Sequence, residues 1–334
     1  MSTQPLAKHD DRDQDLTPNL VKHHDRDEDL TFNLPSGRTI GYARYGSSKS
    51  SHQTTIYLHG YPASRIEASI ISRDLSPSGL QLIALDRPGF GLSTPSDKPL
   101  SDRTILDHAE DIRALADHLG LSHFQILAVS GGAPYAYACA HLFPERLSGV
   151  GILAGLGPYK YAMSKEVWSQ LWWVNKLGLT IPMRFPWLYE RLYGWIVSFL
   201  VQRFSRSTFE KVANGLVVDE STSKDKLALL AAGEQGYEDL KHTIQEATRQ
   251  QGFARYHVDE ARLLAKEWSF RLEDIRCGNL RLWYGSDDIN TPLIMGEMIK
   301  SSLGDQAELN VVPGGTHTTV VYDGAKYLKE LLGM

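Results

Sequence analysis

A serine with small neighbours directly follows a short apolar run, and its hydroxyl is the first group in the chain that could act as a nucleophile. Ser130 comes after the run Phe124–Val129, in the string Ala128-Val-Ser-Gly-Gly132, and a helix-like stretch follows. A strand-to-helix turn this tight needs small side chains at positions 128 and 132. It exposes the serine hydroxyl beside the free N–H groups of a helix N-terminus. The pattern therefore predicts a nucleophile elbow.

Two later turns supply the base and the acid that such a serine needs. His317 lies in a glycine-containing turn after the last apolar run, and two adjacent acids, Asp287 and Asp288, follow the run Leu280–Tyr284. The chain order serine, acid, histidine is the order expected when this elbow carries a catalytic triad. We therefore predict that Ser130, His317 and one of the two aspartates act together.

The oxyanion that forms during acyl transfer needs hydrogen-bond donors, and two backbone N–H groups are candidates. One is the N–H of Gly131, directly after the nucleophile. The other is the N–H of Tyr61, because the run Thr54–Leu58 ends in His59-Gly-Tyr-Pro62 and the glycine lets the chain turn inward. His59 precedes the serine in the chain, so we interpret it as a residue that orients this loop.

Apolar runs of strand length alternate with helix-like stretches from residue 54 onward. Continuous apolar runs separated by helices are typical of parallel strands that are covered on both faces. The strands are expected at Thr54–Leu58, Leu80–Leu85, Phe124–Val129, Leu147–Leu153, Leu280–Tyr284 and Glu308–Val312. The helices are expected at Ser101–Leu119, with Ser101 in the cap, and at Gly132–Phe143, Pro292–Leu303 and Thr318–Leu332. The predicted fold class is α/β.

One long interval, between Leu156 and about Glu273, contains no convincing strand. It is rich in large aromatic side chains, and its prolines divide it into short helices; its tryptophans are Trp168, Trp172, Trp173, Trp187, Trp195 and Trp268. A structureless loop of this length is implausible in a compact domain. We therefore expect a helical insertion, with most aromatic side chains in its core and some facing whatever lies beneath it.

Five motifs together resemble the α/β-hydrolase superfamily. They are His59-Gly-Tyr-Pro62, Asp86-Arg-Pro-Gly-Phe-Gly-Leu-Ser93, Ala128-Val-Ser-Gly-Gly132, Gly285-Ser-Asp-Asp288 and Gly315-Thr-His317. The elbow departs from the family in having Ala128 where glycine is commoner. The resemblance covers the chain from about residue 30 to the C-terminus.

This resemblance implies a mostly parallel eight-stranded sheet with helices on both faces and an inserted helical cap. It places a core at 29–155 and 274–334 and a cap at 156–273, and the acidic residues 1–28 that precede the core are expected to form a mobile tail. The family spacing Gly-x-x-Asp selects Asp288 as the acid of a Ser130–His317–Asp288 triad and leaves Asp287 as a helix cap. The motif Asp86–Ser93 is expected to have a structural role near the site.

An acidic repeat occupies the N-terminal end of the chain. The segment Lys8–Leu20 is echoed by Lys22–Leu34, and residues 1–34 hold four basic and eight acidic residues. The second copy leads through a Ser-Gly turn into Thr39–Tyr45, which predicts a hairpin. The first copy is expected to be a mobile tail, in which His9, His23 and His24 are solvated rather than bound to a metal.

Composition excludes several classes of protein. The 334 residues are 42% hydrophobic and 22% charged, which is ordinary for a globular chain, and the formal net charge of −5 argues against nucleic-acid binding. Two cysteines cannot form a disulfide framework. Neither a signal peptide nor an apolar run long enough to span a membrane is evident. We expect a soluble cytoplasmic protein with no cofactor and no metal, and the sequence leaves its oligomeric state open.

These observations favour a serine hydrolase that cleaves an ester, thioester or lactone of a small, largely apolar molecule. Enzymes that resemble this chain also include C–C bond hydrolases and cofactor-free haloperoxidase-like enzymes with the same triad. Epoxide hydrolases and haloalkane dehalogenases are disfavoured, because they place an aspartate where Ser130 stands. The alternative is a ligand-binding protein or a non-hydrolytic enzyme that uses the capped pocket, since the superfamily includes hormone receptors.

Overall fold

An eight-stranded sheet lies at the centre of the computed structural model, which describes residues 26–46, 53–75, 78–202, 207, 210 and 220–334. The strand order is β1-β2-β4-β3-β5-β6-β7-β8. The hairpin β1–β2 is antiparallel, β2 is antiparallel to β4, and all other neighbours are parallel. The strands are β1 (Arg26–Asn33), β2 (Thr39–Gly46), β3 (Thr54–Leu58), β4 (Gln81–Leu85), β5 (Phe124–Val129), β6 (Leu147–Leu153), β7 (Leu280–Gly285) and β8 (Ala307–Val312).

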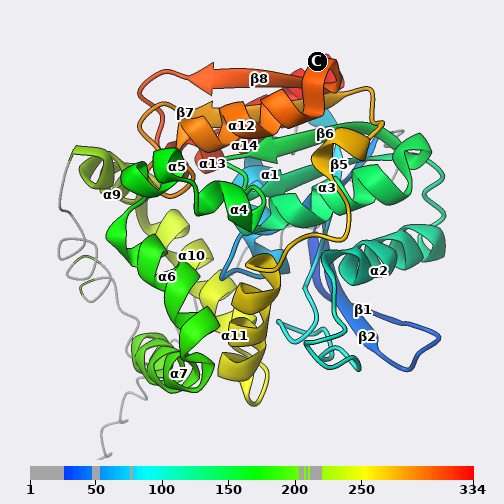
Figure 1. Ribbon diagram of the computed structural model, residues 1–334. Coiled ribbons are helices and arrows are strands. Elements are labelled where there is room, and N and C mark those ends of the chain that lie inside the picture. The colour runs from blue at the N-terminus through cyan, green and yellow to red at the C-terminus, as the bar shows by residue number, and fades with distance from the viewer. Residues whose placement is uncertain (1–25, 47–52, 76–77, 203–206, 208–209, 211–219) are drawn as a thin grey trace, which may run out of the picture.

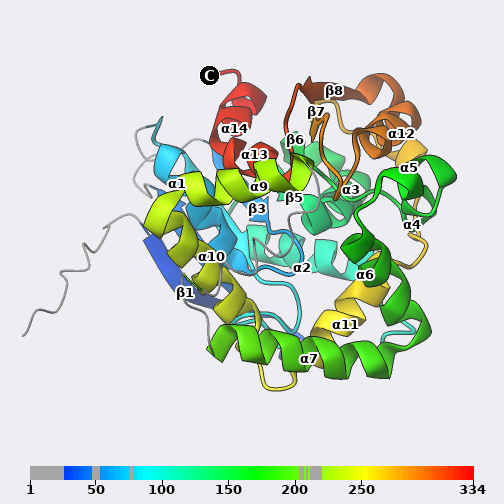
Figure 2. The ribbon, with the colours of Figure 1, turned by 90° about the vertical axis from the view of Figure 1, so that its left-hand side faces the viewer.

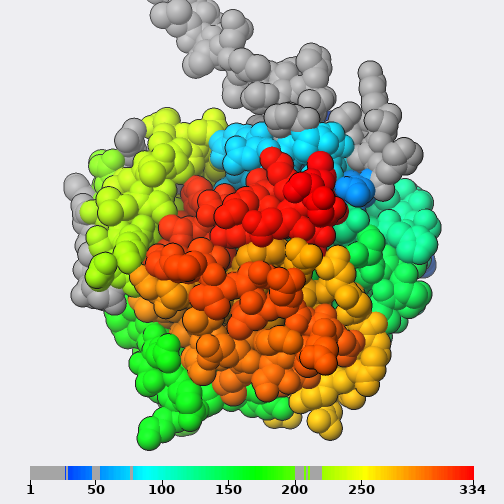
Figure 3. All heavy atoms as spheres, turned by 90° about the horizontal axis from the view of Figure 1, so that it is seen from above, coloured from blue at the N-terminus to red at the C-terminus, as the bar shows by residue number. Residues whose placement is uncertain are grey.

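Helices cover both faces of this sheet (Figure 1). One apolar core joins the sheet to α2 (Ile105–His118), α3 (Ala133–Leu142) and α12 (Leu293–Leu303). A second core on the other face joins it to α1 (Ser69–Leu75), α13 (His317–Tyr322) and α14 (Gly324–Leu332). Seen from above, the C-terminal segment lies between the α1 region and the β8–α12 region (Figure 3). The predicted α/β class, with a mostly parallel sheet, is confirmed.

The expected strands and the expected hairpin are present, whereas two helix predictions need correction. The first long helix begins at Ile105 and not near Ser101, because Thr104 and Asp107 form its capping box, with Thr104 N donating to Asp107 Oδ2 at 2.7 Å. The last helix is in two pieces, α13 and α14, which meet at Asp323. Gly324 follows this break, and a Cβ placed there would lie 2.9 Å from Ile71.

A group of helices is inserted between β6 and β7. It comprises α4 (Tyr159–Ala162), α5 (Lys165–Gln170), α6 (Trp173–Arg184), α7 (Pro186–Gln202), α9 (Glu220–Ala231), α10 (Gly233–Ala247) and α11 (Phe253–Leu264), and its described part contains no strand. These helices gather beside the carboxyl ends of the parallel strands (Figures 1 and 2). None of the helices that the structure describes is long and apolar enough to cross a bilayer. The first repeat copy, including His9, and His23 and His24 of the second lie outside the described residues.

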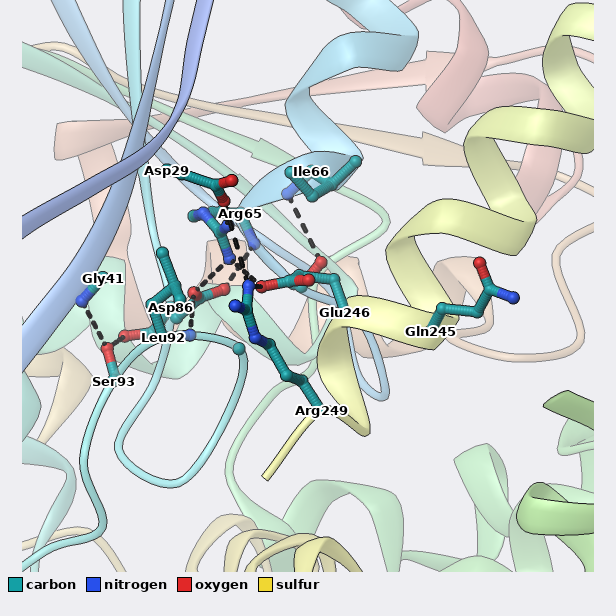
Figure 4. Close-up of polar contacts among 12 residues, drawn as sticks. Asp29, Gly41, Arg65, Ile66, Asp86, Leu92, Ser93, Gln245, Glu246 and Arg249 are labelled. Atoms are coloured by element: carbon teal, nitrogen blue, oxygen red, sulfur yellow. Dashed lines mark hydrogen bonds and ion pairs between the residues drawn. The ribbon is translucent and has the colours of Figure 1, made fainter. Parts of the chain in front are cut away.

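A fully buried arginine ties the N-terminal strand and the insertion to the centre of the sheet (Figure 4). Arg65 contacts Asp86 at 2.8 Å after β4, Glu246 at 2.7 Å on α10, and Asp29 at 2.6 Å on β1. Asp86 also accepts hydrogen bonds from the N–H groups of Arg65 and Leu92. Burial outweighs the attraction of Arg65 and raises the pKa of Asp86 to about 6. The ion pairs of Arg65 therefore connect three distant parts of the chain.

We expect the Arg65→Met variant to lose about 3–5 kcal/mol of unfolding free energy, because it leaves the buried Asp86 carboxylate without its cation. The measurement is urea-induced unfolding followed by circular dichroism. Arg113→Met is the matched control, since Arg113 pairs with Glu110 at the surface and its loss should cost about 1 kcal/mol or less. Equal unfolding midpoints for the two variants would contradict the structural role assigned to Arg65.

Candidate active site

Ser130 lies at the sharp turn between β5 and α3 that the sequence predicts. Its φ angle is +48°, in the left-handed region that a non-glycine residue rarely adopts. The strand and helix approach so closely that a Cβ placed on Gly132 would lie 2.3 Å from the carbonyl oxygen of Leu58. Strand, strained serine and helix therefore have the arrangement of a nucleophile elbow.

The turns after β7 and β8 bring the predicted acid and base together. A Cβ placed on Gly285 would lie 2.1 Å from the carbonyl oxygen of Gly315, so only glycine permits this approach of the two turns. His317 begins α13, and its Nδ1 lies 2.8 Å from Asp288 Oδ2. This places the imidazole and the carboxylate, 29 positions apart in the chain, in direct hydrogen-bond contact.

Of the two adjacent aspartates, Asp288 is the one that faces His317. Asp288 is 3% exposed, and its Oδ1 accepts hydrogen bonds from the N–H groups of Asn290 and Thr291 at 2.7 and 2.9 Å. Asp287 instead pairs with Lys224 at 2.5 Å, and this hydrogen bond lowers the pKa of Asp287. The predicted capping role of Asp287 is wrong, because the residue at the N-cap of α12 is Pro292.

The surroundings of His317 favour its protonated form. Burial opposes the positive charge, but the attraction and hydrogen bond of Asp288 outweigh it, with further contributions from Asp225 and Glu67, and the pKa of His317 is raised. Asp225 lies on α9 and accepts hydrogen bonds from the Thr316 hydroxyl and from the Thr318 N–H, the latter at 2.9 Å. Sequence reasoning missed Asp225, because nothing in the periodicity of the insertion indicates which residues face the turn after β8.

Ser130 and His317 line the same pocket of about 460 Å³. The described residues give no direct hydrogen bond between the Ser130 hydroxyl and the imidazole, whereas His317 and Asp288 are joined. Catalytic hydrogen bonds are often long without substrate and tighten in the complex. The structure thus brings the acid to the base and places the serine and the base around one cavity.

The two candidate oxyanion donors lie side by side at this pocket. A Cβ placed on Gly131 would lie 3.3 Å from the backbone nitrogen of Tyr61. The peptide between Gly60 and Tyr61 is held from its carbonyl side, where Gly60 O accepts from Arg87 Nη2 at 2.5 Å and contacts His59 Nδ1 at 2.8 Å. Because the carbonyl and N–H of a trans peptide point in opposite directions, the Tyr61 N–H is directed away from Arg87.

Arg87 is a buried support for this loop that sequence reasoning did not single out, although it belongs to the motif Asp86–Ser93. It also donates to the carbonyl oxygens of His59 and Gly131 at 2.9 and 3.3 Å, and its Nε lies 3.0 Å from Glu260 Oε1 on α11. Burial, together with the nearby Arg87, lowers the pKa of His59 well below its ordinary value. The His59 ring thus contacts the carbonyl group of its own loop, and burial disfavours its charged form.

The pocket itself is mostly apolar. Besides Ser130 and His317 its described lining consists of tyrosines, aliphatic side chains, three threonines, His257 and one carboxylic acid, Glu67. Glu67 Oε2 accepts hydrogen bonds from Gly60 N at 2.8 Å and from the Tyr57 hydroxyl at 2.9 Å. Sequence reasoning missed Glu67, since a single glutamate after the loop His59–Pro62 carries no recognisable spacing.

A family model described as alpha/beta hydrolase fold matches residues 55–320. Among solved structures, an alpha/beta hydrolase fold protein from Nakamurella multipartita is 19% identical, with a TM-score of 0.60 over 91% of this chain and 98% of that chain. A structure from a study of Nitrososphaera gargenis carboxylesterases is 15% identical, with a TM-score of 0.60 over 91% and 97%. An N-acyl homoserine lactone degrading enzyme is 17% identical, with a TM-score of 0.57 over 91% and 100%.

These structural likenesses show a shared fold. Comparison with curated proteins finds no match.

Proposed function

Because this chain belongs to the alpha/beta hydrolase family, we propose that it is a serine hydrolase that cleaves an ester, thioester or lactone of a small, largely apolar molecule. The observation that carries the proposal is the contact of 2.8 Å between His317 Nδ1 and Asp288 Oδ2, at the wall of the pocket that also exposes Ser130. An apolar pocket of this size suits a small acyl compound rather than a polymer.

Ser130 attacks the substrate carbonyl while His317 Nε2 accepts the hydroxyl proton, and Asp288 stabilises the resulting imidazolium. The N–H groups of Tyr61 and Gly131 hold the oxyanion. Collapse of this intermediate breaks the bond to the leaving alcohol or thiol, which takes the proton from His317, and leaves an acyl group on Ser130. Water then attacks the acyl group by the same route, releasing the acid and restoring the serine.

We assign the inserted helices, residues 156–273, to a cap over this site. Helices α7 and α10 contribute Tyr193 and Ile244 to the pocket lining, so the insertion shapes the space for the substrate. Ester and lactone hydrolysis share one acyl-enzyme route, and both carboxylesterases and a lactone-degrading enzyme are found among proteins of this fold. Leaving-group selectivity is then a property of the cap residues.

A fluorophosphonate probe distinguishes this hydrolase from a ligand-binding protein of the same fold. We expect rapid covalent labelling of one residue, Ser130, identified by peptide mass spectrometry, because only an activated serine displaces fluoride from phosphorus. A folded protein that stays unlabelled, or that is labelled elsewhere, would remove the proposed function.

The pH dependence of turnover should follow His317. Only the neutral imidazole accepts the serine proton, so kcat/KM should fall as pH decreases through the pKa of His317, which lies above the ordinary value of 6.5. Asp288 is the main cause of this raised pKa, and the Asp288→Asn variant should therefore move the residual acid limb to lower pH. The measurement is kcat/KM against pH for a neutral ester. An acid limb at the same pH in the wild type and in the Asp288→Asn variant would contradict the assignment of this limb to His317.

A further inference from the structure

The lining of the pocket contains few groups that can carry a charge. Among the described lining residues, Glu67 is the sole carboxylic acid, and lysine and arginine are absent. His257 also lines the pocket, but burial lowers the pKa of His257 to about 4, so it is neutral at physiological pH. His317 must itself be neutral to act as a base. With His317 neutral, as catalysis requires, the described lining holds no cation that faces Glu67, and the nearby Arg87, which supports the loop, does not line the pocket.

The two carboxylate oxygens of Glu67 differ in their hydrogen bonds to the described residues. Oε2 accepts both hydrogen bonds, from Gly60 N and from the Tyr57 hydroxyl. The hydrogen bonds that the described residues make to the Glu67 carboxylate both go to Oε2, and Glu67 borders the cavity. Oε1 and the nucleophile also border the same space beside Gly60, because a Cβ placed on Gly60 would lie 3.3 Å from Glu67 Oε1 and 3.6 Å from Ser130 Cβ.

A fixed carboxylate beside the nucleophile opposes the negative charge that develops on the oxyanion. Burial disfavours this charge in the absence of ligand and raises the pKa of Glu67, although the hydrogen bonds from Gly60 and Tyr57 and the charges of Arg87 and His317 counteract that effect. A cation on the substrate would remove the conflict by pairing with Oε1. Three tyrosines that line the pocket, Tyr61, Tyr193 and Tyr322, are side chains that also favour an ammonium group.

We propose that the pocket recognises substrates that carry an ammonium group near the scissile carbonyl, bound by Glu67 Oε1 beside Ser130. This substrate class rests on the proposed hydrolase function. The apolar remainder of the lining holds the hydrocarbon part of the substrate, and Glu67 determines specificity without entering the proton transfers.

Isosteric ester pairs test this specificity. Choline butyrate is compared with 3,3-dimethylbutyl butyrate, which replaces the quaternary nitrogen by carbon, and phenyl glycinate is compared with phenyl propionate to place the charge on the acyl side. We expect a preference of about tenfold or more in kcat/KM for the cationic member of at least one pair, as for a hydrogen-bonded or ion-paired charge. The Glu67→Gln variant, which keeps the shape, should reduce that preference to about threefold or less.

The matched control is Glu238→Gln, which removes an exposed carboxylate on α10 and should leave both preferences unchanged. Wild-type protein that hydrolyses neutral esters with no preference, or a preference that survives in the Glu67→Gln variant, would overturn the inference and leave the hydrolase function standing.

A binding measurement keeps the two proposals separate. Calorimetric titration of the Ser130→Ala variant with choline and with 3,3-dimethylbutanol needs no turnover, and we expect tighter binding of choline that is lost when Glu67→Gln is added. Selective choline binding by a protein that hydrolyses no ester would support the cation site while removing the hydrolase function. Equal binding of the two alcohols would count against the cation site.

Discussion

The Ser130→Ala variant should lose kcat for ester hydrolysis by about 10⁴-fold or more, without loss of folding stability. The hydroxyl is the only group at the elbow that can form the acyl-enzyme, and its removal leaves the oxyanion donors and the pocket intact. The fall should appear in kcat rather than in KM, because the lost interaction is made only in the transition state. Steady-state kinetics with p-nitrophenyl butyrate measure it.

The control for this substitution is Ser101→Ala, which removes an exposed serine hydroxyl before α2. It should leave kcat unchanged. Thermal unfolding of both variants shows whether any loss reflects the fold. If the Ser130→Ala protein is folded and still turns over the ester within a factor of about ten of the wild type, the nucleophile lies elsewhere.

The Asp288→Asn variant should lower kcat by about 10³- to 10⁴-fold. Asp288 accepts the Nδ1 proton of His317 at 2.8 Å, and this bond fixes the imidazole with its other nitrogen free to accept a proton. An asparagine amide at this position can present N–H to Nδ1 and so stabilise the wrong tautomer, as well as removing the charge that supports the imidazolium.

The adjacent residue supplies a matched control. Asp287→Asn removes the same charge one position away, where the carboxylate pairs with Lys224 at the protein surface. We expect its kcat to stay within about threefold of the wild type. Equal losses in the two variants would show that the effect comes from the charge of this turn and not from the contact with His317.

The sequence was sufficient to predict the sheet and the turns that meet at its carboxyl edge. Buried parallel strands are continuous apolar runs, so β5 and β7 could be located, and each turn after a strand ends at the same edge. The nucleophile elbow could also be predicted, because only small residues such as Gly132 fit between the strand and the helix. The order of Ser130, Asp288 and His317 then indicated the site.

What the sequence did not indicate depends on contacts between distant segments. Asp225 and Glu67 approach His317 from the insertion and from the segment after β3, and no periodicity relates them to it. The guanidinium of Arg87 supports the oxyanion loop by donating hydrogen bonds to backbone carbonyl groups. Every residue has such a carbonyl group, so the sequence does not indicate which ones Arg87 contacts. The helix break at Asp323 was not indicated either, and Gly324 after it packs closely against Ile71.

The most direct test of the central claim is to trap the covalent intermediate. Wild-type protein is mixed with excess p-nitrophenyl butyrate, quenched with acid during turnover, and digested for peptide mass spectrometry. Our account predicts a butyryl group on Ser130, accumulated before the steady state and missing from the Ser130→Ala protein. Steady turnover with no acyl group on Ser130, or with the group on another residue, would contradict it.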